Sequence, residues 1–137
     1  MRDLSDDVST EDETRSVVEQ FYDCLLRADL DGVSRLLHPD VVVHEAPSSP
    51  NGGAHTGRTE ALKFLALMIF QIIADTVMGG DVLVGASPAA AFLVIPFTPG
   101  DPPLLQARLP VVEKFVIRDS LITEITPYYY DAAAVVT

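Results

Sequence analysis

VVEKFVIRDSLITEITPYYYD, residues 111–131, contains two runs of β-branched and aromatic residues separated by Arg118-Asp119-Ser120. Two such runs on either side of a short polar turn are typical of a β-hairpin. Because apolar residues also precede the quoted segment, we predict strands over Leu104–Ile117 and Leu121–Tyr129.

The rest of the chain divides into helices first and strands afterwards. Val17, Phe21 and Leu25 recur at helical spacing, and later segments alternate or are β-branched. This order is typical of an α+β domain in which an antiparallel sheet packs on helices. We predict helices over Glu11–Ala28 (capped by Ser9 or Thr10), Leu30–Leu37 and Thr59–Ala74, strands over Val41–Glu45, Val77–Val84 and Ala89–Phe97, and a loop over 46–57.

Length and composition indicate one domain and exclude several partners. The chain has 137 residues, of which 48% are hydrophobic, and its formal net charge is −11. An acidic protein is repelled by the negative charge of nucleic acid and of an anionic membrane surface, which argues against both as binding partners. Six acids lie in the first thirteen residues. We therefore predict a poorly ordered acidic tail over residues 1–10 and a single domain over 11–137.

Other features favour a cytoplasmic protein. Cys24 is the single cysteine, so no internal disulfide can form, and the N-terminus lacks the pattern of a secretory signal. The apolar segment 61–74 is shorter than the roughly 20 residues that cross a bilayer. We interpret it as a buried helix.

Glu113 is a polar residue on an apolar strand face. Side chains alternate along a strand, so Glu113 shares its face with Val111, Phe115 and Ile117. Glu45 likewise shares a strand face with two apolar residues, Val41 and Val43. A buried carboxylate without a partner costs several kcal/mol. Each acid is therefore either catalytic or a structural residue with a partner, and two such acids in one small sheet favour a pocket with shifted pKa values.

Three segments resemble the nuclear transport factor 2-like superfamily in its SnoaL-like branch. They are FYDCLLRADLDGVSRLLHPDVVVHEAP (21–47), GGAHTGRTEALKFL (52–65) and the quoted segment 111–131. The resemblance covers roughly residues 15 to 131. It implies a cone-shaped α+β barrel of three helices and a curved antiparallel sheet, with an apolar pocket. It also implies a homodimer that packs sheet faces together.

The resemblance extends to polyketide cyclases and ketosteroid isomerases. It places Glu113 where these proteins have a carboxylate, two residues before the aromatic Phe115, and Glu45 where the isomerases have a base. The tyrosine of the isomerase oxyanion hole corresponds most nearly to Phe21, which cannot donate a hydrogen bond. Tyr22 is adjacent but about 100° away round the helix.

Other side chains are weaker candidates. His55 lies in the predicted loop and either contacts a ligand at the pocket mouth or hydrogen-bonds within the loop. Tyr128 is expected at the pocket lip, with the core edge or a dimer contact as alternatives. His44 alternates with Glu45 and should face away. No spacing fits a metal site, and we predict neither metal nor cofactor.

These observations favour a cofactor-independent cyclase or isomerase. Glu113 and Glu45 would act as catalytic acid and base, while Tyr22, Phe21, His55, Phe115 and Tyr128 would bind an apolar, polyketide- or terpenoid-like substrate. The alternative is a non-catalytic ligand-binding or dimerisation module of the same fold. Epoxide hydrolysis is less favoured, because the strand AAAFLVIPF (89–97) contains neither Arg nor Asp.

Overall fold

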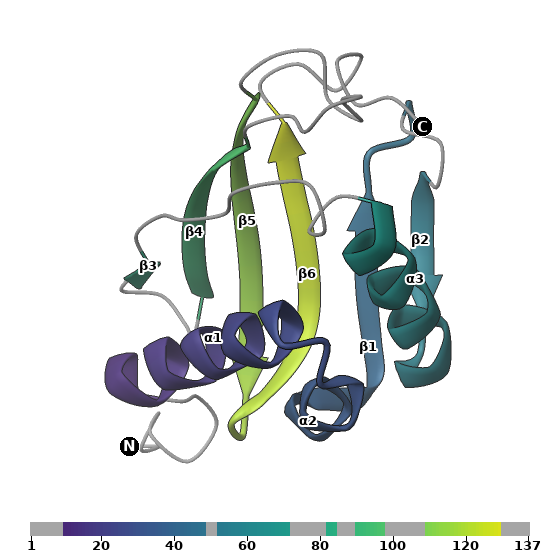
Figure 1. Cartoon of the computed structure of the whole chain (residues 1–137). Coiled ribbons are helices and arrows are strands. Elements are labelled where there is room, and N and C mark those ends of the chain that lie inside the picture. Colours follow the sequence, from purple (N-terminus) through teal and green to yellow (C-terminus); the bar gives the residue numbers. More distant parts are fainter. Residues whose placement is uncertain (1–9, 49–51, 72–81, 85–89, 98–108, 130–137) are drawn as a thin grey trace.

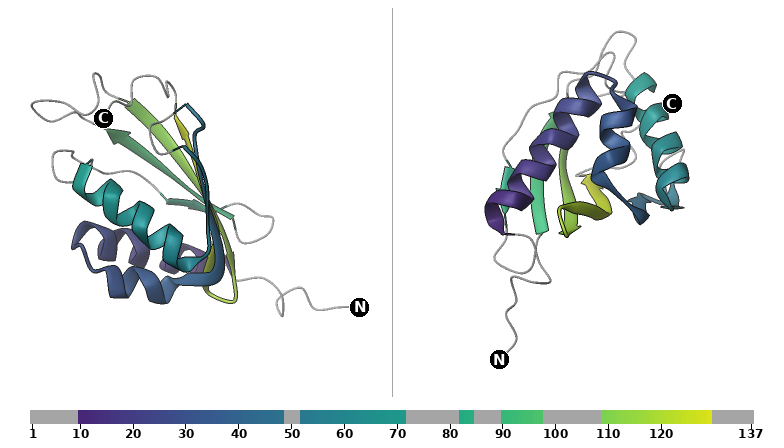
Figure 2. Two further views of the ribbon diagram at one scale, coloured as in Figure 1. Left: turned by 90° about the vertical axis from the view of Figure 1, so that its right-hand side faces the viewer. Right: turned by 90° about the horizontal axis from the view of Figure 1, so that it is seen from below.

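Three helices cover one face of a six-stranded sheet (Figure 1). The computed structural model describes residues 10–48, 52–71, 82–84, 90–97 and 109–129. In Figure 2 the helices lie together on one side of the sheet. The elements are α1 (Glu11–Leu26), α2 (Leu30–Leu36), β1 (Leu37–Glu45), β2 (Gly53–Thr56), α3 (Arg58–Gln71), β3 (Val82–Val84), β4 (Ala90–Phe97), β5 (Leu109–Arg118) and β6 (Leu121–Tyr129).

The strands are ordered β2-β1-β6-β5-β4-β3 across the sheet. The α+β architecture with three helices is therefore confirmed. The expectation of a wholly antiparallel sheet was wrong in one pair, because β1 runs parallel to β6. Side-chain alternation reports which face a residue occupies, not the direction of the neighbouring strand. The sheet is consequently mixed.

Local signals explain where the first elements begin and end. Thr10 caps α1 in a capping box: its side chain accepts a hydrogen bond from the Glu13 N–H, and the Glu13 side chain accepts one from the Thr10 N–H. Asp29 caps α2 by accepting from the Gly32 N–H at 2.9 Å. The predicted hairpin turn is also present, with positive φ angles at Asp119 (53°) and Ser120 (61°), as two-residue hairpin turns require.

Three elements differ from the sequence prediction. The predicted loop 46–57 contains strand β2, which pairs with β1 from Val42↔Thr56 to Glu45↔Gly53. Strand β1 begins at Leu37 rather than Val41, so His38 and Pro39 belong to the strand. Helix α3 begins at Arg58, which places Thr59 inside the helix instead of at its cap. Neither 37–40 nor 53–56 has the alternating pattern of a strand, and both become strand because they join a neighbouring strand, at Leu37↔Ile122 and along β1.

Parts of several predicted elements lie outside the described residues. These are most of the acidic tail (1–9), the end of the third helix (72–74), the start of the Val77–Val84 strand (77–81) and the start of the Leu104–Ile117 strand (104–108).

The hydrophobic core lies between the helices and the sheet face that they cover. Helix α1 contributes its apolar stripe and β5, β6 and β1 contribute alternate residues. Arg58 joins α3 to β1, because its guanidinium donates two hydrogen bonds to the Leu37 carbonyl, at 3.1 and 2.7 Å. The buried apolar residues are Val17, Val18, Phe21, Leu25, Val33, Leu37, Val41, Val43, Ala61, Phe64, Leu65, Phe115, Ile117, Ile122 and Ile125.

One substitution made at a buried and at an exposed leucine tests this core. Leu37 is 0% exposed and Leu26 is 52% exposed. We expect Leu37→Ala to lower the free energy of unfolding by about 2–5 kcal/mol, because it leaves a cavity. Leu26→Ala should change it by less than about 0.5 kcal/mol. Urea denaturation measures both values, and equal losses in the two variants would contradict the assigned core.

Candidate active site and the comparisons

The two acids lie on the same face of the sheet, here called the inner face because the helices cover it. On β1, Val41, Val43 and Glu45 are buried and their alternate neighbours are not. On β5, Phe115 and Ile117 are buried, which places Glu113 on the inner face by alternation. The opposite face of the sheet is called the outer face.

Pro127 of β6 lies between the two acids. Glu113 pairs with Pro127, and Glu45 is level with it because Val43 pairs with Ile125 two residues earlier. Both carboxyls therefore flank a proline ring that has no N–H to offer.

The environment of Glu113 favours its protonated form. Burial raises the pKa of the Glu113 carboxyl from 4.5 to about 7. A hydrogen bond from the Tyr22 hydroxyl lowers this pKa, and the negative charge of Glu45 raises it. Burial and the nearby charge of Glu45 therefore both shift Glu113 towards its protonated form, so that a large share of it keeps its proton at pH 7.

The Glu45 side chain is almost completely buried, with 5% of its surface exposed. Its Oε1 accepts a hydrogen bond of 2.7 Å from the Ala46 N–H. Hydrogen bonds of this kind stabilise the carboxylate form. Glu45 thus lies at the end of β1 with one carboxylate oxygen bound to the backbone.

An aromatic cluster supports Glu113 from helix α1. The rings of Phe21 and Phe115 meet edge-on at 5.4 Å, and Tyr22 meets both, at 5.2 Å from Phe21 and 5.8 Å from Phe115. Phe21 is 1% and Phe115 0% exposed, so both are core residues. The hydroxyl beside the acid is that of Tyr22, although the family correspondence favoured position 21.

His55 is located on β2 and not in a loop over a pocket mouth. It pairs with Val43, an inner-face residue, and its ring stacks on Phe64 of α3 at 4.4 Å with an interplanar angle of 25°. His44, by contrast, lies on the outer face, where its Nε2 contacts Glu124 Oε1 at 3.2 Å. The expected orientation of His44 is therefore observed, while the expected loop position of His55 was wrong.

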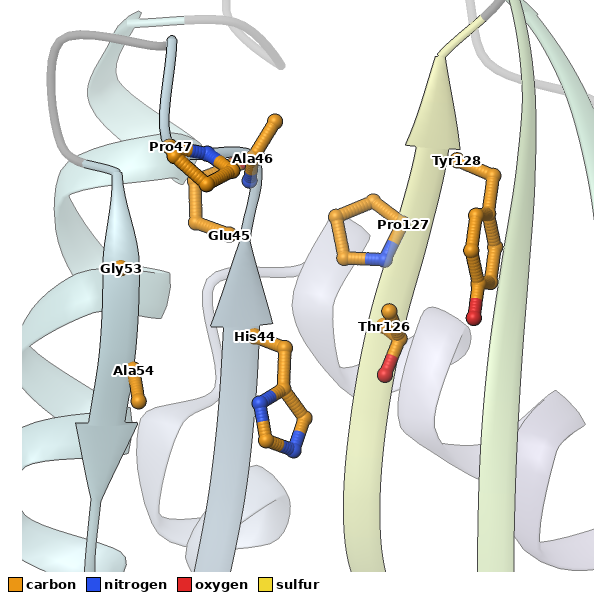
Figure 3. A pocket seen from close by; sticks show the side chains of 9 residues that line it. All are labelled: His44, Glu45, Ala46, Pro47, Gly53, Ala54, Thr126, Pro127 and Tyr128. Atoms are coloured by element: carbon orange, nitrogen blue, oxygen red, sulfur yellow. The ribbon is translucent and has the colours of Figure 1, made fainter.

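A pocket of about 490 Å³ lies where β1 and β6 separate (Figure 3). We call it the strand-gap pocket. It contains two of the residues predicted from the sequence, Glu45 and Tyr128, whereas Glu113 does not line it. Its lining residues are His44, Glu45, Ala46, Pro47, Gly53, Ala54, Thr126, Pro127 and Tyr128.

Sequence reasoning missed Thr126 and Pro127. The sequence did show a proline inside the predicted strand Leu121–Tyr129, and such a proline marks a place where a hydrogen bond between strands is lost. Which neighbouring strand would be affected could not be known without the strand order.

Within the described residues no cluster of three or more metal-ligating side chains is present. Nor does any described helix have the length and apolarity needed to cross a membrane.

The family follows from a match over most of the sequence. The profile of the SnoaL-like domain matches residues 18–125. The chain belongs to the SnoaL-like domain family. The match begins within α1 and ends within β6, so the SnoaL-like domain includes both Glu45 and Glu113. No curated protein matches the sequence significantly.

Solved structures share the fold at low sequence identity. A nuclear transport factor 2-like protein from Burkholderia xenovorans has a TM-score of 0.74 at 18% identity, covering 92% of this chain and 95% of its own. A candidate ketosteroid isomerase from Kribbella flavida has a TM-score of 0.69 at 20% identity, covering 89% of this chain and 81% of its own. A candidate polyketide cyclase from Sinorhizobium meliloti has a TM-score of 0.67 at 18% identity, covering 82% of this chain and 94% of its own. Such likeness establishes the cone-shaped nuclear transport factor 2-like fold.

The protonation of Glu113 makes stability depend on pH. The folded state keeps this proton up to about pH 7, whereas the unfolded chain releases it near 4.5. The folded state therefore binds more protons between these values, and its stability falls as pH rises through them. We expect the free energy of unfolding of the wild type, relative to Glu113→Gln, to fall by up to about 3 kcal/mol between pH 4 and pH 8. Urea denaturation at several pH values measures this difference, and a constant difference would refute the assignment.

Removal of the Tyr22 hydroxyl should raise the pKa of Glu113 further. The hydroxyl stabilises the ionised carboxyl, so Tyr22→Phe removes a stabilising contact from that form alone. The titration of the Glu113 Cδ resonance by ¹³C NMR measures the shift. Tyr128→Phe, which removes a hydroxyl on the outer face, is the matched control and should leave the titration unchanged. A lower pKa in Tyr22→Phe would contradict the contact.

Proposed function

We propose that the protein is a cofactor-independent cyclase or isomerase that acts on an apolar, polyketide- or terpenoid-like small molecule. The observation that carries this proposal is the arrangement of Glu113 and Glu45 on one sheet face. Burial raises the pKa of the Glu113 carboxyl to about 7, and the Glu45 carboxyl accepts a hydrogen bond from the backbone. A general acid and a general base on either side of one surface are what enolate chemistry needs.

The proton transfers follow from these two states. Glu45 removes a proton from a carbon next to a carbonyl group, and the electron pair moves onto the carbonyl oxygen. Protonated Glu113 donates a hydrogen bond to this developing oxyanion, which stabilises it in a water-poor site. Glu45 then returns the proton to another carbon in an isomerisation. In a cyclisation the enolate carbon attacks a second carbonyl of the same molecule, whose oxygen receives the proton.

The surroundings of the acids support an apolar substrate. Tyr22 touches Glu113 and would assist the oxyanion, while Phe21 and Phe115 fix Tyr22 from within the core. His55, stacked on Phe64, offers an aromatic and polar edge on the inner face beside β1. The names of two fold relatives, a candidate ketosteroid isomerase and a candidate polyketide cyclase, agree with reactions that pass through enolates. The cytoplasmic location, the homodimer and a place in secondary metabolism stay predictions.

A non-catalytic ligand-binding module is the second candidate. It is favoured by the strand-gap pocket, which reaches Glu45 but is not lined by Glu113. In that case the raised pKa of Glu113 would be a consequence of burial in a core and not a device for catalysis.

The exchange of carbon-bound hydrogen separates the two candidates. In D₂O, the wild type should accelerate deuterium incorporation next to the carbonyl of small β,γ-unsaturated ketones and 1,3-diketones, followed by ¹H NMR. We expect Glu113→Gln to slow this exchange by roughly 10²- to 10⁴-fold, the usual contribution of a general acid or base. The melting temperature should change little, because Gln has nearly the same shape.

Lys114→Gln is the matched control, since Lys114 is the next residue of β5 and faces the other side of the sheet. It should exchange deuterium at the wild-type rate. Unchanged exchange in Glu113→Gln would remove Glu113 from the mechanism. No acceleration by the wild type with any of these ketones would favour the binding module.

A further inference from the structure

Thr14 of α1 buries a hydroxyl group that the fold does not satisfy. The side chain is 0% exposed, and its Oγ1 has no hydrogen-bond partner among the described residues. Solvent cannot reach a side chain that is fully covered, so the hydrogen bonds that this hydroxyl makes to water in the unfolded chain are lost on folding. A buried polar group without a partner costs free energy comparable to a lost hydrogen bond. Thr14 therefore destabilises the packed position of α1.

Packing alone does not require a hydroxyl at this position. Valine has nearly the same branched shape without the hydroxyl, and α1 uses it at Val17 and Val18, which are both buried. The side chain of Thr123, by contrast, has a partner, because its Oγ1 donates to the Val116 carbonyl at 3.0 Å. The unpaired hydroxyl thus distinguishes Thr14 from a residue that only fills the core.

Thr14 lies in the half of α1 that covers the edge of the sheet. Helix α1 contacts β3, β4 and β5, and its first turns lie beside β3 and β4 in Figures 1 and 2. Strand β3 has three residues and is the last strand of the sheet on this side. We call Glu11–Val17 the leading turns of α1. They rest on a strand that is itself short and paired on one side only.

The remainder of α1 is held more firmly. Phe21 and Leu25 are buried, and the ring of Phe21 meets that of Phe115 at 5.4 Å. The end of the helix is tied to the next one, because the Asp29 N–H donates to the Cys24 carbonyl at 2.8 Å. The two halves of α1 therefore differ in how strongly they are attached to the domain.

Movement of the leading turns would uncover the inner face beside Glu113. Glu113 pairs with Leu93 of β4, and paired residues of two strands point to the same face of the sheet. Tyr22, which contacts Glu113 from the other half of α1, would stay in place. In the open position water reaches the Thr14 hydroxyl, so the cost of leaving it unpaired exists only in the closed position.

From these observations we infer that the leading turns of α1 are a lid over the β4 side of the inner face. The lid opens while the rest of the domain stays folded, and the unpaired hydroxyl of Thr14 favours its opening. This inference adds a conformational step to the proposed function. The use of the lid as an entry to Glu113 rests on that function, whereas the opening itself does not.

Amide hydrogen exchange, followed by ¹H–¹⁵N NMR, measures the opening. The first four N–H groups of a helix have no partner within it, so the amides of Ser16 and Val17 are the ones that report on the leading turns. Those of Phe21 and Leu25 report on the remainder. In the wild type, Ser16 and Val17 should exchange faster than Phe21 and Leu25. Low concentrations of urea should hardly change their rates, because a local opening exposes little surface.

Thr14→Val tests the role of the hydroxyl. It removes a cost that exists only in the closed position, so exchange at Ser16 and Val17 should slow roughly tenfold. Thr123→Val is the matched control, since the same change there leaves the Val116 carbonyl unpaired and destabilises the whole domain. It should accelerate exchange at Phe115 but leave Ser16 and Val17 at the wild-type rate.

Two results would overturn the lid. One is acceleration at Ser16 and Val17 in Thr123→Val, because the leading turns would then open only when the whole domain unfolds. The other is exchange in Thr14→Val that is as fast as in the wild type, because the hydroxyl would then have no influence on opening.

The deuterium exchange of ketones tests the use of the lid as an entry. Thr14→Val should lower the second-order rate constant for this reaction by about the same factor as the amide exchange, and Thr123→Val should not. Unchanged ketone exchange in Thr14→Val, together with slowed amide exchange, would overturn the role in entry. A wild type that does not accelerate ketone exchange would contradict the proposed function, while the amide rates would still decide whether the lid opens.

Discussion

The edge-on contact of Phe115 with Phe21 and Tyr22 joins helix α1 to strand β5 and sets the geometry of the inner face. Both phenylalanines are buried and cannot move without opening the core. Because Tyr22 follows Phe21 in the helix, the same contact brings a hydroxyl to Glu113. Packing of apolar rings therefore decides which polar group meets the acid.

This arrangement explains how one small domain can hold two acids on a face that is otherwise apolar. The free-energy cost of burying them is reduced in two ways: the raised pKa of Glu113 favours its uncharged form, and Glu45 accepts a hydrogen bond from the Ala46 N–H. Two ionised carboxylates in the same low-dielectric region would repel each other and weaken the fold.

The separation of β1 from β6 beyond Val43↔Ile125 gives the domain a second surface of interest. Most of the inner face is closed by helices, whereas the gap between β1 and β6 connects one acid with the outer face. The two acids consequently differ in their access. Glu45 lines the strand-gap pocket, and Glu113 does not.

Several features of the fold could be predicted from the sequence because they depend on residues close together in the chain. The capping box at Thr10, the hairpin turn at Asp119-Ser120 and the placement of Glu113 among apolar neighbours are of this kind. The SnoaL-like resemblance added the cone-shaped fold, which the match over residues 18–125 and the structural relatives confirm.

Other features depend on residues far apart in the chain, and only the tertiary structure decided them. The parallel pairing of β1 with β6, the existence of β2 and the position of His55 on it all follow from strand pairing. Tyr22, not Phe21, meets Glu113 because of how α1 lies across β5. Alternation and helical periodicity determined by themselves that two acids face inward. Which residues contact those acids could be seen only in the tertiary structure, because local patterns contain no information on which segments become neighbours.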